Sequence, residues 1–253
     1  MKSKGRLFLA VSAVVIWLFA TVGPAQADII YTGSLQYTPP SPPDWSDELT
    51  VGGPVGQWEN RTITFFWTVT LMENNDLYPE FPVKYEYRVL LSADDHAYSH
   101  MSIEVSDSFD DNCIVGLSNA TIDSIGTQKM GQANQGMPEA FYAIKFNPPN
   151  DDLTDWTFSF FSNRGPVWGD IYVRDGGRAG VINHAYNYNM DENGVESGFL
   201  SPDTDPMCAA SAGTEANHYF YHVLRPDTHC PEPATLSLLA FGGLGVLLIR
   251  RRK

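Results

Sequence analysis

Hydrophobicity that alternates with a period of two is the feature that most constrains the fold of this chain. Between Val83 and Leu91 every second residue is apolar with mostly charged residues between, and the same alternation runs from Met101 to Val105. A strand with one buried face shows this period, whereas a half-buried helix repeats about every 3.6 residues. Other runs are rich in β-branched and aromatic residues and are bounded by turn residues. They span 62–72, 140–146, 157–161, 167–173 and 219–224.

These runs predict an all-β fold. Roughly eight to ten short strands, all antiparallel, favour a single β-sandwich, of which the jelly roll is one form. No stretch between the two ends of the chain has a capped, helical apolar stripe. Two segments instead predict loops: 37–56, which holds five prolines and either projects as an arm or covers a sheet edge, and 121–138, which is rich in Gly, Gln and Asn. We find no internal repeat and no second domain boundary.

The N-terminal residues predict a secretory signal peptide. Lys2, Lys4 and Arg6 make a positive start, residues 7–22 form an apolar core, and Ala25-Gln26-Ala27 is a small-x-small cleavage site. The mature protein is therefore expected to begin at Asp28 after cleavage by signal peptidase and passage through the export machinery. An uncleaved signal anchor is the alternative, and the Ala-Gln-Ala ending disfavours it.

The C-terminal residues have a tripeptide, a span and a basic tail. Pro231, Glu232 and Pro233 precede an uncharged run from 234 to 249, which Arg250, Arg251, Arg252 and Lys253 follow. The run is shorter than the roughly 20 residues that cross a bilayer comfortably. Basic residues next to a membrane span stay in the cytoplasm, so the body lies on the far side. We expect three parts: a signal peptide (1–27), a β-sandwich domain (28–230) and a sorting signal with a transmembrane helix (231–253).

In order and spacing, the C-terminal stretch resembles the PEP-CTERM sorting signal. The resemblance implies recognition by an exosortase-type sorting protease that cuts near the tripeptide, and a transient stay in the inner membrane through the C-terminal helix. An ordinary tail anchor is the alternative, which Gly242, Gly243 and Gly245 disfavour because they weaken a permanent span.

Stretches of the body are also similar to one group of PEP-CTERM surface proteins. They are 99–106, 136–146, 157–160 continuing to 166–172, and 224–228, where that group usually has Val in place of Arg225. This resemblance implies one domain of one architecture, and it implies no particular activity or cofactor.

The charge of the body limits its partners. Seven of the 16 basic residues but only one of the 30 acidic residues lie in the two ends, so the body has a formal charge of −20 at pH 7. Such a charge repels nucleic acid and anionic membrane surfaces, and we exclude both as partners. It suits surroundings rich in divalent cations, although a solvated acidic surface is the commoner reason for it.

Two acidic segments are candidate calcium sites, and calcium is the one candidate cofactor. Asn189, Asp191 and Asn193 alternate as they do at the start of a calcium loop, but Leu200 stands where the bidentate Glu should be. A tight turn at Asn193-Gly194 is therefore the favoured interpretation. The second segment holds Asp107, Asp110 and Asp111 after a strand, where a solvated loop is again the commoner structure.

Histidine and cysteine give weaker signals. His96 and His100 are four apart, as are His218 and His222, but strands rather than helices are expected there and no third zinc ligand is evident. The first pair is expected at the surface. Cys113, Cys208 and Cys230 allow three single disulfides, between which the sequence does not choose.

The aromatic residues fit a sandwich core better than a stacking platform for sugars. Trp45 and Trp58 lie in surroundings rich in Pro and Gly, so they are the two expected at the surface and the candidates for carbohydrate binding. No nucleophile elbow, phosphate loop or dinucleotide motif is present, and no residue is assigned a catalytic role.

The sequence therefore predicts an exported, non-enzymatic protein of the cell surface or extracellular matrix. We expect a structural or adhesive role associated with exopolysaccharide. Two alternatives stay open: a secreted polysaccharide hydrolase that uses two of the 29 carboxylates of the body, and a calcium-dependent carbohydrate-binding module.

Overall fold

The computed structural model describes residues 27–39, 49–53, 57–92, 97–150, 152–177, 182–187 and 222–229. Within them the protein is all-β, with antiparallel pairing in every sheet, as predicted. The strands are β1 (Ile29–Tyr37), β2 (Leu49–Gly52), β3 (Ile63–Leu71), β4 (Val83–Leu91), β5 (Tyr98–Glu104), β6 (Ile114–Ser118), β7 (Thr121–Gln128), β8 (Phe141–Asn147), β9 (Asp155–Ser162), β10 (Arg164–Gly169), β11 (Ile171–Asp175), β12 (His184–Asn187) and β13 (Val223–His229). Two short 3-10 helices, η1 (Trp58–Asn60) and η2 (Asp111–Cys113), stand between strands.

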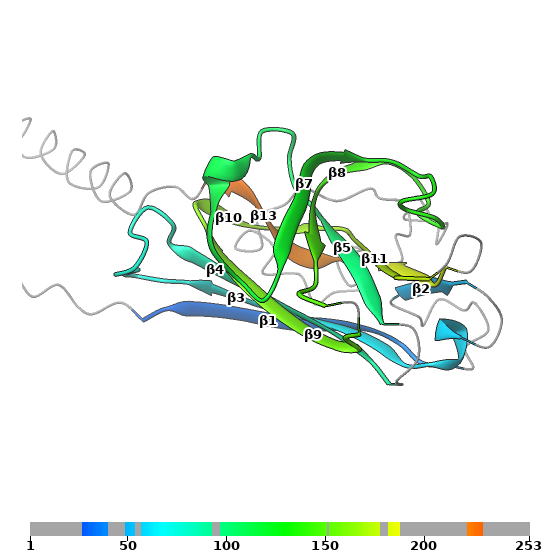
Figure 1. Ribbon diagram of the computed structural model, residues 1–253. Coiled ribbons are helices and arrows are strands. Elements are labelled where there is room, and N and C mark those ends of the chain that lie inside the picture. The colour runs from blue at the N-terminus through cyan, green and yellow to red at the C-terminus, as the bar shows by residue number, and fades with distance from the viewer. Residues whose placement is uncertain are drawn as a thin grey trace, which may run out of the picture.

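Two sheets and a ribbon make up the domain (Figure 1). Sheet A has the strand order β1-β3-β4-β9-β6, and sheet B has the order β2-β12-β11-β5-β8-β7. The ribbon is the pair β10-β13. From β9 to β11 the chain is almost continuously extended, so it leaves sheet A, pairs with β13 in the ribbon and then enters sheet B.

The predicted alternation is what builds the core. In β4 the five apolar residues from Val83 to Leu91 are at most 3% exposed, while the residues between them are half-buried on the outer face. Inward aromatic rings from both sheets meet: Phe146 of β8 and Phe158 of β9 have ring centroids 4.8 Å apart. Burial of many such rings is the main favourable contribution to the stability of the sandwich.

The ribbon packs on the inner face of sheet A through two tyrosines of β4. The hydroxyl of Tyr85 donates to the carbonyl of Arg164 (3.0 Å), and that of Tyr87 donates to the carbonyl of Leu224 (2.8 Å). Both rings are fully buried, so each hydroxyl needs a partner, and the ribbon backbone provides one. β13 is thus held against strands that lie far earlier in the sequence.

Some sequence expectations need correction. Residues 121–138 were expected to form a loop, but Thr121–Gln128 is the edge strand β7, paired with β8. The remainder of that segment lies against sheet B, where Met137 is 1% exposed and the hydroxyl of Tyr172 donates to the carbonyl of Gln135. Polar composition misled the prediction because an edge strand with one solvated face needs few apolar residues.

Other strands differ from their predicted limits. The run 167–173 is divided between β10 and β11 by Asp170, and the last described strand, Val223–His229, continues past the predicted end at residue 224. The proline-rich segment 37–56 contains β2, which pairs with β12 at one edge of sheet B. Within the described residues no helix is long and apolar enough to cross a membrane. The predicted signal peptide and sorting helix lie outside the described residues, apart from Ala27.

Candidate functional site

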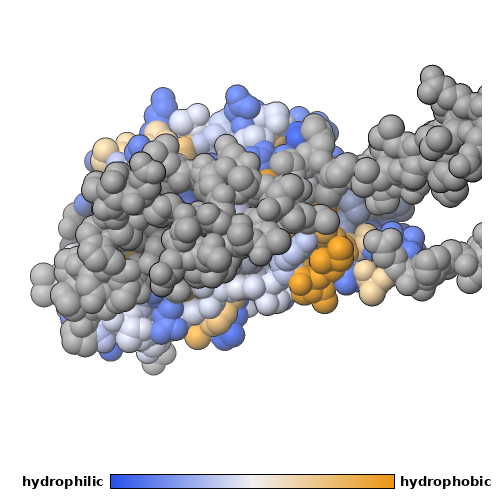
Figure 2. All heavy atoms as spheres, turned by 180° about the vertical axis from the view of Figure 1, so that it is seen from behind, coloured by the Kyte–Doolittle hydropathy of each residue, from blue (hydrophilic) through white to orange (hydrophobic). Residues whose placement is uncertain are grey.

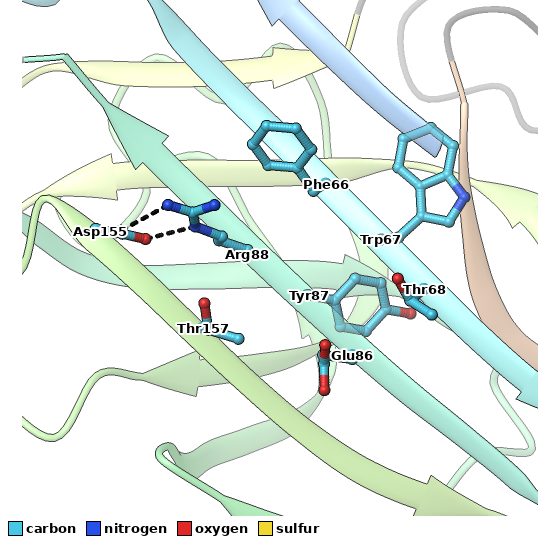
Figure 3. Close-up of a pocket in the computed structure, with 8 residues that line it drawn as sticks. All are labelled: Phe66, Trp67, Thr68, Glu86, Tyr87, Arg88, Asp155 and Thr157. Carbon is cyan, nitrogen blue, oxygen red and sulfur yellow. Dashed lines mark hydrogen bonds and ion pairs between the residues drawn. The ribbon is translucent and has the colours of Figure 1, made fainter. Parts of the chain in front are cut away.

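The outer face of sheet A carries an open depression of about 460 Å³. Its lining residues come from the central strands β3, β4 and β9, and Figure 3 shows them together: Phe66, Trp67, Thr68, Glu86, Tyr87, Arg88, Asp155 and Thr157. The strand register explains why they meet. Phe66 stands opposite Arg88 and Arg88 opposite Thr157, while Thr68 stands opposite Glu86 in the next outward-facing row.

An ion pair at the surface orders one side of this depression. The guanidinium of Arg88 donates from Nε to Oδ1 of Asp155 and from Nη2 to Oδ2, both at 2.7 Å. The same guanidinium lies 5.6 Å from the centre of the Phe66 ring, within the range of a cation–π contact. The hydrogen bond from Arg88 lowers the pKa of the Asp155 carboxyl, and the hydrogen bond with Asp155 raises the pKa of Arg88. Both groups are charged at neutral pH.

This arrangement suits a polar polymer better than an enclosed small molecule. The side chains of Arg88 and Asp155 are 42% and 50% exposed, so a ligand reaches both from solvent. Carboxylates and a guanidinium hydrogen-bond hydroxyl groups, and an aromatic ring contacts the apolar face of a sugar. Pockets for small molecules are concave and bury most of the ligand, which this open sheet face does not do.

A second polar group is buried where β5, β11, β12 and β13 meet. Asp170, between β10 and β11, is fully buried, and its Oδ1 lies 2.6 Å from Nδ2 of Asn187 and 3.0 Å from Nδ1 of His222. Its backbone N–H donates to Oε2 of Glu104 (2.9 Å), whose other oxygen lies 3.2 Å from Nη2 of Arg225.

The buried group has a structural role. A His–Asp pair that acts on a substrate needs a ring nitrogen open to it, and His222 is only 4% exposed. Arg225 is 1% exposed and also bonds Asp227 at 2.5 Å, so its charge is matched inside the protein. Gly169 permits this packing, because a Cβ there would overlap the side chain of Arg225. The group fastens β13 to the remainder of the domain.

Three of the acidic candidates for calcium, Asp107, Asp110 and Asp111, lie in the part of the chain that the structure describes. The described residues hold no group of three or more His, Cys, Asp or Glu side chains able to bind a metal ion. Asp110 instead caps η2, accepting from the backbone N–H of Asn112 at 2.9 Å, and this hydrogen bond lowers the pKa of its carboxyl. Asp107 and Asp111 are exposed on the same loop. Asn189, Asp191 and Asn193 lie outside the described residues.

Trp58 is not at the surface, which corrects the sequence expectation. Its side chain is fully buried, and its ring meets the ring of Tyr98 edge to face at a centroid distance of 5.6 Å. Its backbone N–H is 3.3 Å from Oδ1 of the buried Asn183. The residue begins η1, and its packing against Tyr98 buries it although the sequence around it is rich in Pro and Gly. Trp45 lies outside the described residues.

Of the histidine and cysteine candidates, the structure describes His100, His222 and Cys113. His100 is 3% exposed rather than at the surface, and its Nε2 lies 3.0 Å from Oδ1 of Asn134. His96 and His218 are outside the described residues, as are Cys208 and Cys230. Cys113 is buried with a free thiol. The sorting-signal residues Pro231, Glu232, Pro233, Arg250, Arg251 and Arg252 are likewise outside them.

Sequence reasoning missed the residues that form the depression. Arg88 stands in a strand whose period of two was recognised, and its outward position follows from that period. Phe66 lies in the run 62–72, which was predicted from its β-branched and aromatic residues, and Asp155 precedes the predicted run 157–161. The partner of Arg88 could not be predicted from the period, because Asp155 is 67 residues away and meets Arg88 only through the register between β4 and β9.

An acidic all-β domain followed directly by a C-terminal sorting signal defines the class of this protein. Residues 229–253 match the family model for the PEP-CTERM protein-sorting motif. The chain is therefore a protein with a PEP-CTERM sorting domain, and the motif implies export, a membrane-anchored precursor and processing by an exosortase.

Other comparisons add little. No curated protein matches the chain. Among solved structures, the KRT10-binding region domain of the pneumococcal serine-rich repeat protein PsrP is 9% identical, and the match covers 70% of this chain and 100% of that one. Its TM-score is 0.19, which is too low to equate the two folds.

Proposed function

We propose that this protein is a non-enzymatic adhesive component of the cell surface or extracellular matrix, and that it binds exopolysaccharide through the depression on sheet A. The observation that carries the proposal is the set formed by Phe66, the Arg88–Asp155 ion pair and the neighbouring Glu86 on one open sheet face. An extended polysaccharide crosses such a face with several weak contacts, and many weak contacts together give useful avidity.

Binding fits this site better than hydrolysis does. A glycosidase needs a carboxylic acid that keeps its proton near neutral pH, usually through burial. The pKa of Asp155 is lowered by its hydrogen bond from Arg88, so this carboxyl is a hydrogen-bond acceptor and not a proton donor. Its side chain is also half exposed.

The proposal includes the processing of the chain. Signal peptidase removes residues 1–27, and the exported domain extends from Asp28 to Cys230. The sorting protease then releases the domain from its membrane span near Pro231-Glu232-Pro233. Residue 28 fits a cleavage point because β1 begins at Ile29, so cleavage there leaves the first strand whole.

Binding to immobilised polysaccharides, neutral and anionic, tests the proposal on the full chain in detergent micelles. Phe66→Ala is expected to weaken binding by about 1 kcal/mol, roughly fivefold, because an aromatic contact is lost. Arg88→Ala is expected to weaken it at least as much. Lys145→Ala is the matched control, since it removes a comparable ion pair with Asp123 from sheet B and should leave binding unchanged.

Two results would count against the proposal. Equal binding by the parent, Phe66→Ala and Arg88→Ala would show that the depression is not the site that binds polysaccharide. Release of reducing sugar ends by the parent protein would favour the hydrolase instead.

A further inference from the structure

The geometry points to a lipid-facing end of the sandwich: we propose that Ile29, Ile30 and Leu77 contact the interfacial region of a zwitterionic bilayer while the precursor is anchored. This contact is separate from the proposed polysaccharide site, which lies further along the strands. It assigns an orientation to the domain before its release.

One row of paired residues defines this end. Ile29 of β1 stands opposite Leu71, Leu71 opposite Val83, and Val83 opposite Ser162, which also pairs with β6. Two residues beyond Ser162, Arg164 stands opposite His229, the last residue of β13. The first strand therefore begins and the last strand ends at the same end of the sandwich (Figure 1).

The start of β1 is fastened there. Oδ1 of Asp28 accepts a hydrogen bond of 3.0 Å from the backbone N–H of Glu73, in the loop between β3 and β4. Leu77 belongs to that same loop, where Oδ1 of Asn75 accepts from its backbone N–H at 3.2 Å. The loop and the first residues of β1 therefore form one surface.

This surface carries more exposed apolar side chains than any other place in the described part of the domain. The large hydrophobic residues that are exposed in the described part of the chain are Ile29 (39%), Ile30 (61%), Leu77 (77%) and Met130 (65%), and three of these four lie at this end. Figure 2 shows a compact hydrophobic area towards one end of the domain. Exposed apolar groups that gather in one place mark an interaction site.

The length of the remaining chain identifies the partner as lipid. The sorting motif starts at residue 229, inside β13, and the uncharged run starts at Ala234. Five residues reach about 17 Å at most when fully extended. The end of β13 is thus held close to the hydrocarbon that the run enters, and the neighbouring isoleucines and leucine face the headgroup region.

Charge restricts the kind of lipid and disfavours a second copy. The same loop carries Glu73, Asp76 and Glu80, and the body as a whole is strongly acidic. These charges repel an anionic surface and repel another copy of the same end. A zwitterionic interface accepts the apolar side chains without that cost.

The resulting orientation turns the depression away from the membrane. The row with Phe66 and Arg88 lies five residues from the first row, or about 17 Å at 3.3 Å per residue. Asp155 lies still further along the sheet.

Quenching by lipid tests the contact on the full chain inserted in phosphatidylcholine vesicles. Leu77→Cys takes a fluorescent label, with Cys208 and Cys230 replaced by Ser and the buried Cys113 retained. Asn60→Cys is the matched control, an exposed position in η1 at the opposite end. Lipids that carry nitroxide quenchers near the headgroup should remove most of the emission of the label at residue 77 and little of that at residue 60.

Further arms make the result decisive. The pair Ile29→Ser and Ile30→Ser should reduce quenching at residue 77, and so should replacing half of the lipid by phosphatidylglycerol. Equal quenching at residues 77 and 60 would overturn the proposal. So would emission at residue 77 that ignores the quenchers but changes with the ratio of protein to lipid, which would indicate contact between copies.

Discussion

Glu104 at the end of β5 and Arg225 in β13 form an ion pair across 121 residues of sequence, with Oε1 and Nη2 3.2 Å apart. The arginine is 1% exposed, and the glutamate side chain is 16% exposed. A buried guanidinium requires anionic partners, and Arg225 contacts the carboxylates of Glu104 and Asp227, where a valine would need none.

Arg225→Val is expected to destabilise the domain by about 3 kcal/mol, because it leaves Glu104 and Asp227 without their cation. Urea unfolding of the full chain in detergent micelles measures the change in the free energy of unfolding. Adding Glu104→Gln to Arg225→Val should restore part of the loss, since one of the two carboxylate charges that contacted the arginine is then removed. Unchanged stability in the single variant would contradict this account.

Gly169→Ala is expected to cost about 1–3 kcal/mol, the usual cost of overpacking a buried position. The new methyl group would overlap the Arg225 side chain and approach Oε2 of Glu104 within 2.7 Å. Gly131→Ala is the control, because nothing lies within 4 Å of a Cβ there. Thermal unfolding compares the two variants. Equal melting temperatures would contradict the prediction, because they would show that the side chains of Arg225 and Glu104 move to accommodate the methyl group at little cost.

The buried His100 is expected to make the domain less stable in mild acid. Burial, together with the nearby charges of Lys145 and Arg174, lowers the pKa of His100 from 6.5 to about 3. Between these values the unfolded chain binds the proton and the folded chain does not. Stability should therefore fall as pH decreases from 6.5 towards 3, by up to about 1.4 kcal/mol per pH unit.

His100→Gln tests this pH dependence, because glutamine does not titrate and can still donate to Asn134. The loss of unfolding free energy between pH 7 and pH 4.5 should be smaller in the variant than in the parent. His184, whose pKa burial also lowers, is unchanged in both and accounts for a remaining slope of the same sign. An identical slope in parent and variant would exclude His100 as the source.

Asp155→Ala is expected to change stability by less than about 1 kcal/mol, because exposed ion pairs contribute little and are screened by salt. The difference between parent and variant should shrink further when the ionic strength is raised, as thermal unfolding at low and high salt would show. A large, salt-insensitive loss would mean that the Arg88–Asp155 pair supports the fold and is not kept for binding.

The period of the sequence predicted the class of the fold and the direction of many side chains. In β4 the alternation separates the buried Tyr85 and Tyr87 from the outward Glu86 and Arg88, as the structure has them. Strands with few apolar residues, such as β7, were not predicted, because their one buried face is only partly apolar.

The candidate site was beyond prediction for a different reason. Arg88 and Asp155 meet through the register of two strands, and register depends on packing across the sheet rather than on local composition. Trp58 shows the same limit, because its Pro- and Gly-rich surroundings in sequence indicated exposure, while packing in the folded domain buries the ring.

The last strand and the sorting motif are consecutive, since β13 ends at the residue where the motif begins. Export delivers a chain from its N-terminus, so both sheets are outside before β13 arrives. The contacts of Leu224 with Tyr87, of Arg225 with Glu104 and of His222 with Asp170 cannot form until the last strand has crossed the membrane. The sandwich can therefore close only when translocation has almost reached its stop, which makes completed folding and arrival of the cleavage signal nearly simultaneous events.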